Sequence, residues 1–225
     1  MKNIIFSISV ITLLGVSCKK DDPLVPVPPA ADKYMSVTAG STWNYELTDN
    51  SATAPVIKLY TVTSTNRDST INTEAYHVFT NSESGNEYYY IDGNDYYNFR
   101  SLPAALGGAN VENIYLKDNV SASNGWPQAY PITVNGISTT ATVTNTITAK
   151  GLTKVVNNIS YTDVIQVTTT IAVVGVPAAS LTTDIQSFYA PKWGMIQSIN
   201  KIKINYLGLS SNVDQTTILK SADIK

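Results

Sequence analysis

Apolar and polar residues alternate with a period of two along most of the chain from Tyr34 onward, and no long stretch has helical periodicity. Such alternation is typical of β-strands with one buried face. In Thr42–Leu47, for example, Trp43, Tyr45 and Leu47 share one face. Fourteen such runs, some of them short, give about eleven or twelve expected strands: 42–47, 56–62, 75–80, 87–91, 96–100, 111–116, 131–134, 137–149, 152–156, 159–161, 164–174, 181–189, 195–207 and 213–219.

Short turn signals separate most of these runs. Asp92-Gly93-Asn94-Asp95 and Asn157-Asn158 are the clearest, because Gly and Asn tolerate positive φ. Hairpin-length connections favour antiparallel pairing, since parallel strands need longer crossovers. We therefore predict an all-β domain, a single antiparallel meander curled into a half-open barrel, with a β-sandwich as the alternative. Residues 101–108 are expected to form one helical turn and residues 118–131 a long loop.

The first part of the chain has a different pattern. Met1–Asn3 carries a positive charge, and Ile4–Val16 is an apolar run of 13 residues. That length suits a secretory signal and is short of the ~20 residues needed to span a bilayer. Asp22–Lys33 contains four prolines, which favour an extended spacer. We expect a signal peptide over 1–17, a tether over 18–33 and the β domain over 34–225.

Cys18, the sole cysteine, stands between the apolar run and the spacer. The segment Leu14-Gly15-Val16-Ser17-Cys18 resembles the lipobox of bacterial lipoproteins. The resemblance implies cleavage before Cys18 and acylation (palmitate or a similar fatty acid) of this residue, which would anchor the protein to a membrane. Several acyl chains make such anchoring stable.

The following tetrapeptide, Lys19-Lys20-Asp21-Asp22, looks like the charged segment after the lipidated cysteine in lipoproteins of the Bacteroidota. In that group, acidic residues at this place direct export to the outer face of the outer membrane. The resemblance therefore implies an outer-membrane lipoprotein displayed on the cell surface. A periplasm-facing outer-membrane lipoprotein is the alternative.

Two more stretches resemble small Bacteroidota lipoproteins of unassigned role. Tyr34–Tyr45 is similar to their Tyr-x-Pro-Leu-x-x-Gly-x-x-Trp-x-Tyr opening, and Tyr189–Ile196 to a segment near their C-termini. The resemblance implies that Gly40 and Gly194 lie in turns and that Trp43 and Tyr45 enter the core. It carries no activity, because the family has none in common.

Composition narrows the classes of function. The net charge is −2 and charged residues make up only 14% of the chain, so a nucleic-acid interface, which needs a basic stripe, is not expected. With one cysteine there is no intrachain disulfide, and with one histidine, His77, a transition-metal site lacks ligands. The sequence contains no cofactor motif. We expect no cofactor, no metal and no enzymatic activity.

Two groups of residues are candidates for binding. Asp92–Asp95 and Glu87 offer oxygen ligands for calcium, although hairpin tips use Asp, Gly and Asn for turn geometry alone. Exposed aromatic rings can stack on sugars or line an apolar groove, or pack only against each other across strands. The candidate ligand-facing aromatics are Tyr88, Tyr90, Tyr97, Trp126 and Trp193. Asp68-Ser69-Thr70 also resembles the O-glycosylation motif of exported Bacteroidota proteins.

The sequence thus predicts a membrane-anchored exported lipoprotein whose non-catalytic β domain binds a glycan, a lipid or a partner protein. The alternative is a structural or accessory envelope protein that has no small-molecule site. A large apolar or aromatic cavity inside the curled sheet would favour the first hypothesis. A concavity filled by the domain's own side chains would favour the second.

Overall fold

The computed structural model describes residues 33–102, 108–134, 136–206 and 209–225. Twelve strands account for most of these residues, and a 3-10 helix, η2 (Ala178–Ser180), follows β9. The strands are β1 (Thr42–Asp49), β2 (Val56–Ile71), β3 (Glu74–Asn81), β4 (Gly85–Asp92), β5 (Asp95–Ser101), β6 (Asn110–Lys117), β7 (Gly125–Val134), β8 (Ile137–Val156), β9 (Ile159–Val173), β10 (Leu181–Ala190), β11 (Gly194–Tyr206) and β12 (Leu209–Asp223). Within the described ranges, no helix has the length and apolar character needed to cross a membrane.

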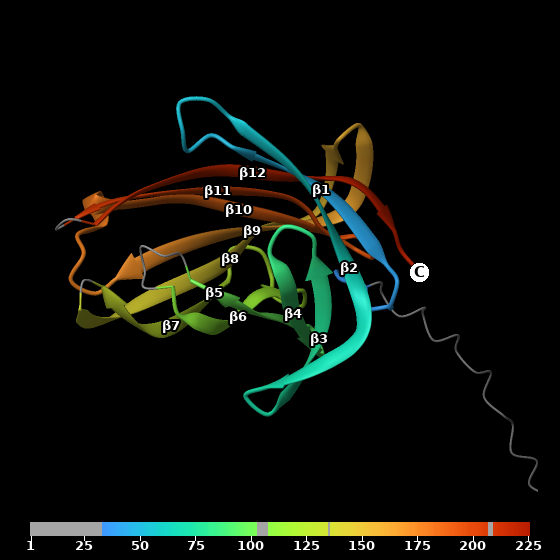
Figure 1. Cartoon of the computed structure of the whole chain (residues 1–225), viewed down its shortest axis with the longest axis horizontal. Helices are drawn as coiled ribbons and strands as arrows, with labels where there is room; N and C mark the ends of the chain where they lie inside the picture. The colour runs from blue at the N-terminus through green and yellow to red at the C-terminus, as the bar shows by residue number, and fades with distance from the viewer. Residues whose placement is uncertain (1–32, 103–107, 135, 207–208) are drawn as a thin grey trace, which may run out of the picture. The chain divides into compact units, whose positions relative to one another are not determined.

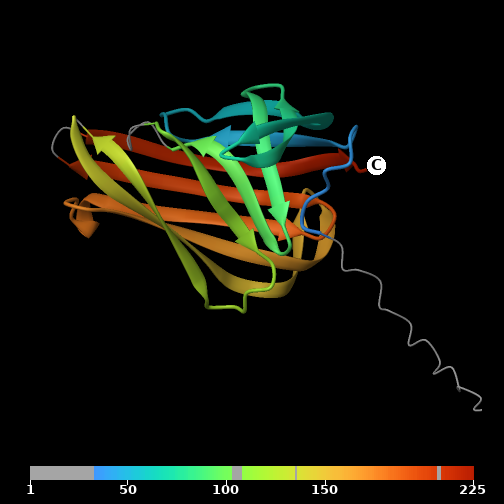
Figure 2. The ribbon, with the colours of Figure 1, turned by 90° about the horizontal axis from the view of Figure 1, so that it is seen from below.

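All twelve strands belong to one antiparallel sheet with the order β6-β5-β4-β3-β2-β1-β12-β11-β10-β9-β8-β7. Each strand pairs with its neighbour in sequence except at β6 and β7, and β1 pairs with β12. The sheet therefore curls almost completely round on itself, as Figures 1 and 2 show, and leaves one seam between β6 and β7. The prediction of a single antiparallel sheet curled into a half-open barrel is confirmed.

Several strands are longer than the alternation pattern indicates. β2 continues through residues 63–71, and the runs at 137–149 and 152–156 form the single strand β8. Gly151 interrupts the alternation of β8 with a φ of +68°, and the register between β8 and β9 shifts around it. Irregularities of this kind absorb extra residues without ending a strand. For the same reason, the runs at 159–161 and 164–174 join in β9.

The long loop predicted for residues 118–131 is wrong, because β7 already begins at Gly125. Pro127 and Pro131 argue against a strand in the sequence, since proline cannot donate to a ladder. An edge strand tolerates proline when its nitrogen faces away from the partner strand, and β7 pairs with β8 alone. The helical turn predicted at 101–108 lies largely outside the described residues.

Side chains bridge the seam where backbone pairing is missing. Gln128 of β7 accepts a hydrogen bond from the Ile114 amide at 2.7 Å and donates to the Ile114 carbonyl at 3.1 Å. The indole N–H of Trp126 donates to the same carbonyl at 2.8 Å, and the Tyr130 hydroxyl donates to the Glu112 carbonyl at 2.9 Å. The two proline nitrogens lie on one edge of β7 and offer no donors there, so alternate side chains of β7 satisfy the backbone of β6 instead.

Candidate functional site

A cavity of about 910 Å³ occupies the interior of the barrel. It lies between residues of the N-terminal segment and the β10–β11 turn at one end, including Tyr34 and Trp193, and residues of the β5 and β6 ends at the other, including Arg100 and Asn110. Arg100 and Asn110 are exposed to solvent. The cavity therefore opens at the end formed by β5 and β6, which we call the mouth.

The closed end of the cavity is aromatic. A line of ring contacts runs from Phe79 to Tyr89 (5.1 Å between centroids), from Tyr89 to Tyr115 (5.9 Å) and from Tyr115 to Tyr189 (5.5 Å). Trp43 contacts Phe79 at 5.8 Å and extends this line on to β1. Tilted and edge-to-face contacts at these distances are favourable for aromatic pairs. The line forms the aromatic floor of the cavity.

Amides and hydroxyls interrupt the apolar wall above that floor. Asn113 donates to the Asn98 side-chain oxygen at 3.1 Å, and Thr169 donates to the Asn145 side-chain oxygen at 2.6 Å. Asn145 is 3% exposed and also donates to the Ile114 carbonyl at 2.8 Å, so it joins the polar wall to the seam. Other polar side chains that line this level are Ser187, Ser198, Asn200 and Thr217. The cavity thus offers hydrogen-bonding groups as well as apolar surface.

Sequence reasoning missed this polar level. In the run at 137–149, the buried face of the strand contains Ala141, Val143 and Ile147 in alternate positions. Asn145 occupies the intervening place in that row. An amide on a face that is otherwise apolar is the signal that could have indicated a polar patch inside the barrel, because a buried amide needs partners.

The two stretches that resemble small lipoproteins meet at the closed end. The indole N–H of Trp43 donates to the Trp193 carbonyl at 2.9 Å, and the Tyr45 hydroxyl donates to the Met195 carbonyl at 2.9 Å. The Lys192 amide donates to the Lys33 carbonyl at 2.7 Å. We call residues 33–41 together with 191–195 the cap. Contacts between segments so distant in sequence cannot be inferred from their spacing.

The turn positions expected within the cap and the core positions expected beside it, in β1, are confirmed. Gly40 and Gly194 have φ of +85° and +73°, in the region that favours glycine. Trp43 and Tyr45 are 4% and 7% exposed. Tyr34 also ties the cap to two walls: its amide donates to the Tyr96 hydroxyl at 3.2 Å, and its own hydroxyl donates to the Asp163 carbonyl at 2.9 Å.

The candidate aromatics fall in different places. Trp193 and Tyr88 are among the residues lining the cavity, whereas Tyr90, Tyr97 and Trp126 are not. Tyr90 packs against Tyr97 at 5.4 Å between centroids, on the face of β4 opposite to Tyr89. Trp126 is 8% exposed and is committed to the seam. Cys18 lies outside the described residues.

The acidic hairpin is built as a turn. Asp92 lies opposite Asp95 in the backbone pairing of β4 with β5, and Gly93 between them has a φ of +57°. Asp95 forms an ion pair with Lys117, and Glu87 accepts hydrogen bonds from Asn81 at 2.6 Å and from the Tyr89 hydroxyl at 3.0 Å. Within the described ranges, no group of three or more His, Cys, Asp or Glu is placed to hold a metal ion.

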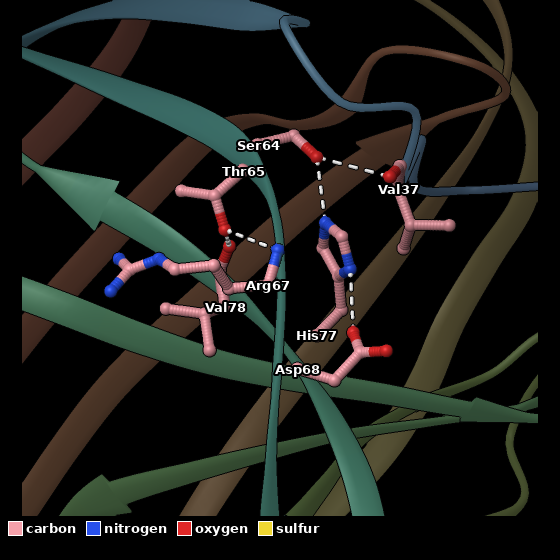
Figure 3. Close-up of polar contacts among 7 residues, drawn as sticks. All are labelled: Val37, Ser64, Thr65, Arg67, Asp68, His77 and Val78. Carbon is pink, nitrogen blue, oxygen red and sulfur yellow. Dashed lines mark hydrogen bonds and ion pairs between the residues drawn. The ribbon is translucent and has the colours of Figure 1, made fainter.

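His77 lies in an arrangement that the sequence did not predict. Its Nε2 is 2.9 Å from Ser64 Oγ and its Nδ1 is 3.1 Å from Asp68 Oδ1, as Figure 3 shows. The register between β2 and β3 jumps from Ser64 opposite Phe79 to Asp68 opposite His77. This bulge brings Ser64 and Asp68 of one strand to the two nitrogens of the same imidazole. The order Ser–His–Asp is that of hydrolase triads.

The surroundings of Ser64 do not suit a nucleophile. Ser64 is 1% exposed, and its hydroxyl donates to the Val37 carbonyl at 3.0 Å. A hydroxyl has one proton, so while Ser64 donates to the Val37 carbonyl it cannot also donate to His77 Nε2, as the serine of a triad does. The Ser64 backbone also bonds Gly40 at 2.8 Å and Ser41 at 2.9 Å. We interpret the group as a clasp that fastens the cap to β2 and β3.

The tyrosines of the cavity make the stability of the protein sensitive to high pH. Burial raises the pKa of Tyr45, Tyr89 and Tyr115 well above the ordinary value of 10, and that of Tyr60 to about 12. Below pH 10 both folded and unfolded chains hold these protons. Above it the unfolded chain releases them first, so stability falls as the pH rises towards the folded pKa values. We expect the urea midpoint to decrease steeply between about pH 10 and pH 12.

The matched variant for this prediction is Tyr115→Phe, which removes one buried hydroxyl and leaves the ring contacts. Its urea midpoint should decrease less steeply over the same pH range, because one fewer group titrates. Parallel titration of tyrosinate absorbance shows when the hydroxyls ionise. Equal slopes for the wild type and Tyr115→Phe would contradict the assignment of this pH dependence to the cavity tyrosines.

The fold therefore defines a class: a twelve-stranded up-and-down barrel with one seam, a cap and an internal cavity. The chain matches no known protein-family profile and no curated protein sequence. It is similar in structure to a protein of Parabacteroides distasonis ATCC 8503 that is provisionally named a lipoprotein, with a TM-score of 0.50 and 12% identity over 86% of this chain and 99% of that one. At this identity the likeness concerns the fold alone.

A second similar structure is that of an outer membrane lipoprotein-sorting protein domain, provisionally named, from Vibrio parahaemolyticus. It shares 11% identity over 82% of this chain and 85% of that one, with a TM-score of 0.23. A score this low supports no argument about the present chain.

Proposed function

We propose that this protein is an exported lipoprotein, anchored at the outer membrane through acyl chains on Cys18 and displayed on the cell surface. Its barrel binds a ligand in the internal cavity without catalysing a reaction on it. A glycan, a lipid or a segment of a partner protein provides the mixture of apolar and hydrogen-bonding surface that the cavity matches. The fold shared with the provisionally named Parabacteroides lipoprotein is consistent with this proposal.

The observation that carries the proposal is the cavity itself. A barrel with a purely structural role is expected to have its interior filled by side chains, because close packing stabilises a core. Here about 910 Å³ stays open, which is within the size range of small-molecule sites. Its walls place polar groups such as Asn98 and Asn200 beside apolar ones such as Val143.

The cap fixes where the chain enters the domain relative to the mouth of the cavity. Lys33, the first described residue, is bonded to Lys192 within the cap, at the closed end of the barrel. The tether over 18–33 therefore joins the domain at the end away from the mouth. A ligand would reach the cavity without passing the point of attachment.

Blocking the cavity tests ligand binding. Ser198 lines the cavity from β11, and the variant Ser198→Trp would fill part of the space. In a thermal-shift screen of glycans and lipids, a ligand at about 100 times its dissociation constant should stabilise the wild type by ~2.7 kcal/mol. We expect that stabilisation to disappear in Ser198→Trp, because the ligand and the indole compete for the same space.

Lys203→Trp is the matched control, since Lys203 lies on the same strand but is exposed on the outside. It adds the same side chain without entering the cavity and should keep the ligand-induced shift. Equal shifts in both variants would place the ligand elsewhere. A wild type stabilised by no glycan or lipid would instead favour the alternative of an accessory protein without a small-molecule site.

A further inference from the structure

Arg100 is the one cationic side chain among the described residues that line the cavity. It lies near the end of β5, at the mouth, where it is opposite Val111 of β6. The described residues give the guanidinium no ion pair and no hydrogen bond. An arginine offers five N–H donors in a planar fork that fits carboxylate, sulfate or phosphate oxygens.

Glu87 is the one anionic residue among those described in the cavity wall, and it is occupied elsewhere. Its Oε1 accepts from Asn81 at 2.6 Å and from Ser84 at 3.4 Å, and its Oε2 accepts from the Tyr89 hydroxyl at 3.0 Å. Three donors therefore satisfy this carboxylate. The Glu87 carboxylate lines the same cavity with its hydrogen-bonding capacity already used, whereas the described residues leave the donors of the Arg100 guanidinium free.

The field of Arg100 reaches into the barrel. Burial raises the pKa of Tyr189, on the aromatic floor, and the positive charge of Arg100 opposes that rise. Arg100 has the same effect on Tyr130 at the seam, where burial raises the pKa to about 12. Arg100 also follows Asn98 by two residues on β5, so it lies on the strand face from which Asn98 lines the cavity.

We infer that the cavity takes an anionic amphiphile: a molecule with an apolar body and one carboxylate, sulfate or phosphate group. This inference rests on the proposed function, since it names the class of ligand for the same cavity. The apolar body lies on the aromatic floor formed by Phe79, Tyr89, Tyr115 and Tyr189. The anionic group pairs with Arg100 at the mouth, where it keeps contact with water.

Two dyes that differ in a single sulfonate test this assignment. Anilinonaphthalene sulfonate has the charge, and phenylnaphthylamine is the same ring system without it; both fluoresce more strongly in an apolar site. We expect the wild type to bind the sulfonate at least about tenfold more tightly, because charge-assisted hydrogen bonds contribute more than neutral ones. Added salt should weaken the binding of the sulfonate dye and leave the binding of the neutral dye almost unchanged.

Arg100→Met keeps the apolar stem and removes the charge, and Arg100→Lys keeps the charge. In Arg100→Met the sulfonate dye should bind about tenfold more weakly while the neutral dye changes less than about twofold, and Arg100→Lys should retain most of the preference. Ser198→Trp should abolish the binding of both dyes if they enter the cavity. Inorganic phosphate, which has charge without an apolar body, should not displace the sulfonate dye.

The outcomes separate the two levels of the proposal. If the neutral dye binds, Ser198→Trp abolishes that binding, and Arg100→Met leaves the sulfonate dye unaffected, the cavity binds ligands but the anionic class is wrong. Equal weakening of both dyes by Arg100→Met also overturns the anionic class, because Arg100 then only shapes the mouth. If neither dye binds to the wild type in a manner sensitive to Ser198→Trp, the ligand-binding function fails as well.

Discussion

Replacing Trp43 by alanine should lower the free energy of unfolding by about 3–5 kcal/mol, the usual cost of removing a large buried aromatic side chain. Trp43 is 4% exposed and packs against Phe79 in the aromatic floor. Its indole N–H also donates the hydrogen bond that joins β1 to the Trp193 carbonyl in the cap. The variant leaves a void and an unpaired carbonyl at once. Urea unfolding followed by circular dichroism measures the loss.

Two variants show how much of this effect comes from each cause. Trp43→Phe keeps most of the apolar volume and loses the hydrogen bond. Loss of this bond should lower the free energy of unfolding by ~1 kcal/mol, in addition to a small effect of the reduced volume. Leu59→Ala is a control on the neighbouring strand, where Leu59 is 72% exposed, and should change stability by less than about 0.5 kcal/mol. A Trp43→Ala protein as stable as Leu59→Ala would contradict the role given to the cap.

Cys18→Ser should move the protein from the membrane fraction to the soluble fraction almost completely. Serine has no thiol to receive a lipid, and each buried methylene of an acyl chain contributes ~0.8 kcal/mol to membrane binding. Fractionation of cells with metabolic labelling by fatty acid measures both consequences. Cys18 is the sole cysteine, so the variant has no other thiol that could be labelled.

Ser17→Ala is the control for this variant, because it keeps a small residue before Cys18 and should leave labelling unchanged. Unchanged membrane retention of Cys18→Ser would contradict lipid anchoring.

Surface display needs a separate test. In cells producing Asp21→Ala/Asp22→Ala, added protease should digest less of the protein than in cells producing the wild type, if the acidic pair directs export to the outer face.

The sequence predicts the strands well where each has one buried and one exposed face. Thr42–Leu47 is such a case, and it lies within β1. The prediction fails where a strand is an edge or is irregular. The segment Asn124-Gly125-Trp126-Pro127 made the start of β7 look like loop, because proline is excluded from strand interiors and the sequence does not show which strand has a free edge.

Much less of the site could be predicted. The pairing of β1 with β12 brings the two ends of the domain together, and the cap and the cavity both depend on it. Tyr88 and Tyr90 were expected to face a ligand, whereas Tyr89 is the residue of this run that joins the aromatic floor. The roles proposed for Arg100 and Asn145 in the cavity depend on side chains from other strands, and spacing along the chain does not reveal those neighbours.

The same β1–β12 pairing limits when the domain can fold. β1 (Thr42–Asp49) is among the first parts of the domain to be synthesised and β12 (Leu209–Asp223) the last, so one edge of β1 remains unpaired until almost the whole domain has been made. Contacts between such distant residues form slowly. The sheet therefore closes between β1 and β12 only after β12 has been made. For the exported protein proposed above, this order would leave the barrel open while the chain crosses a membrane.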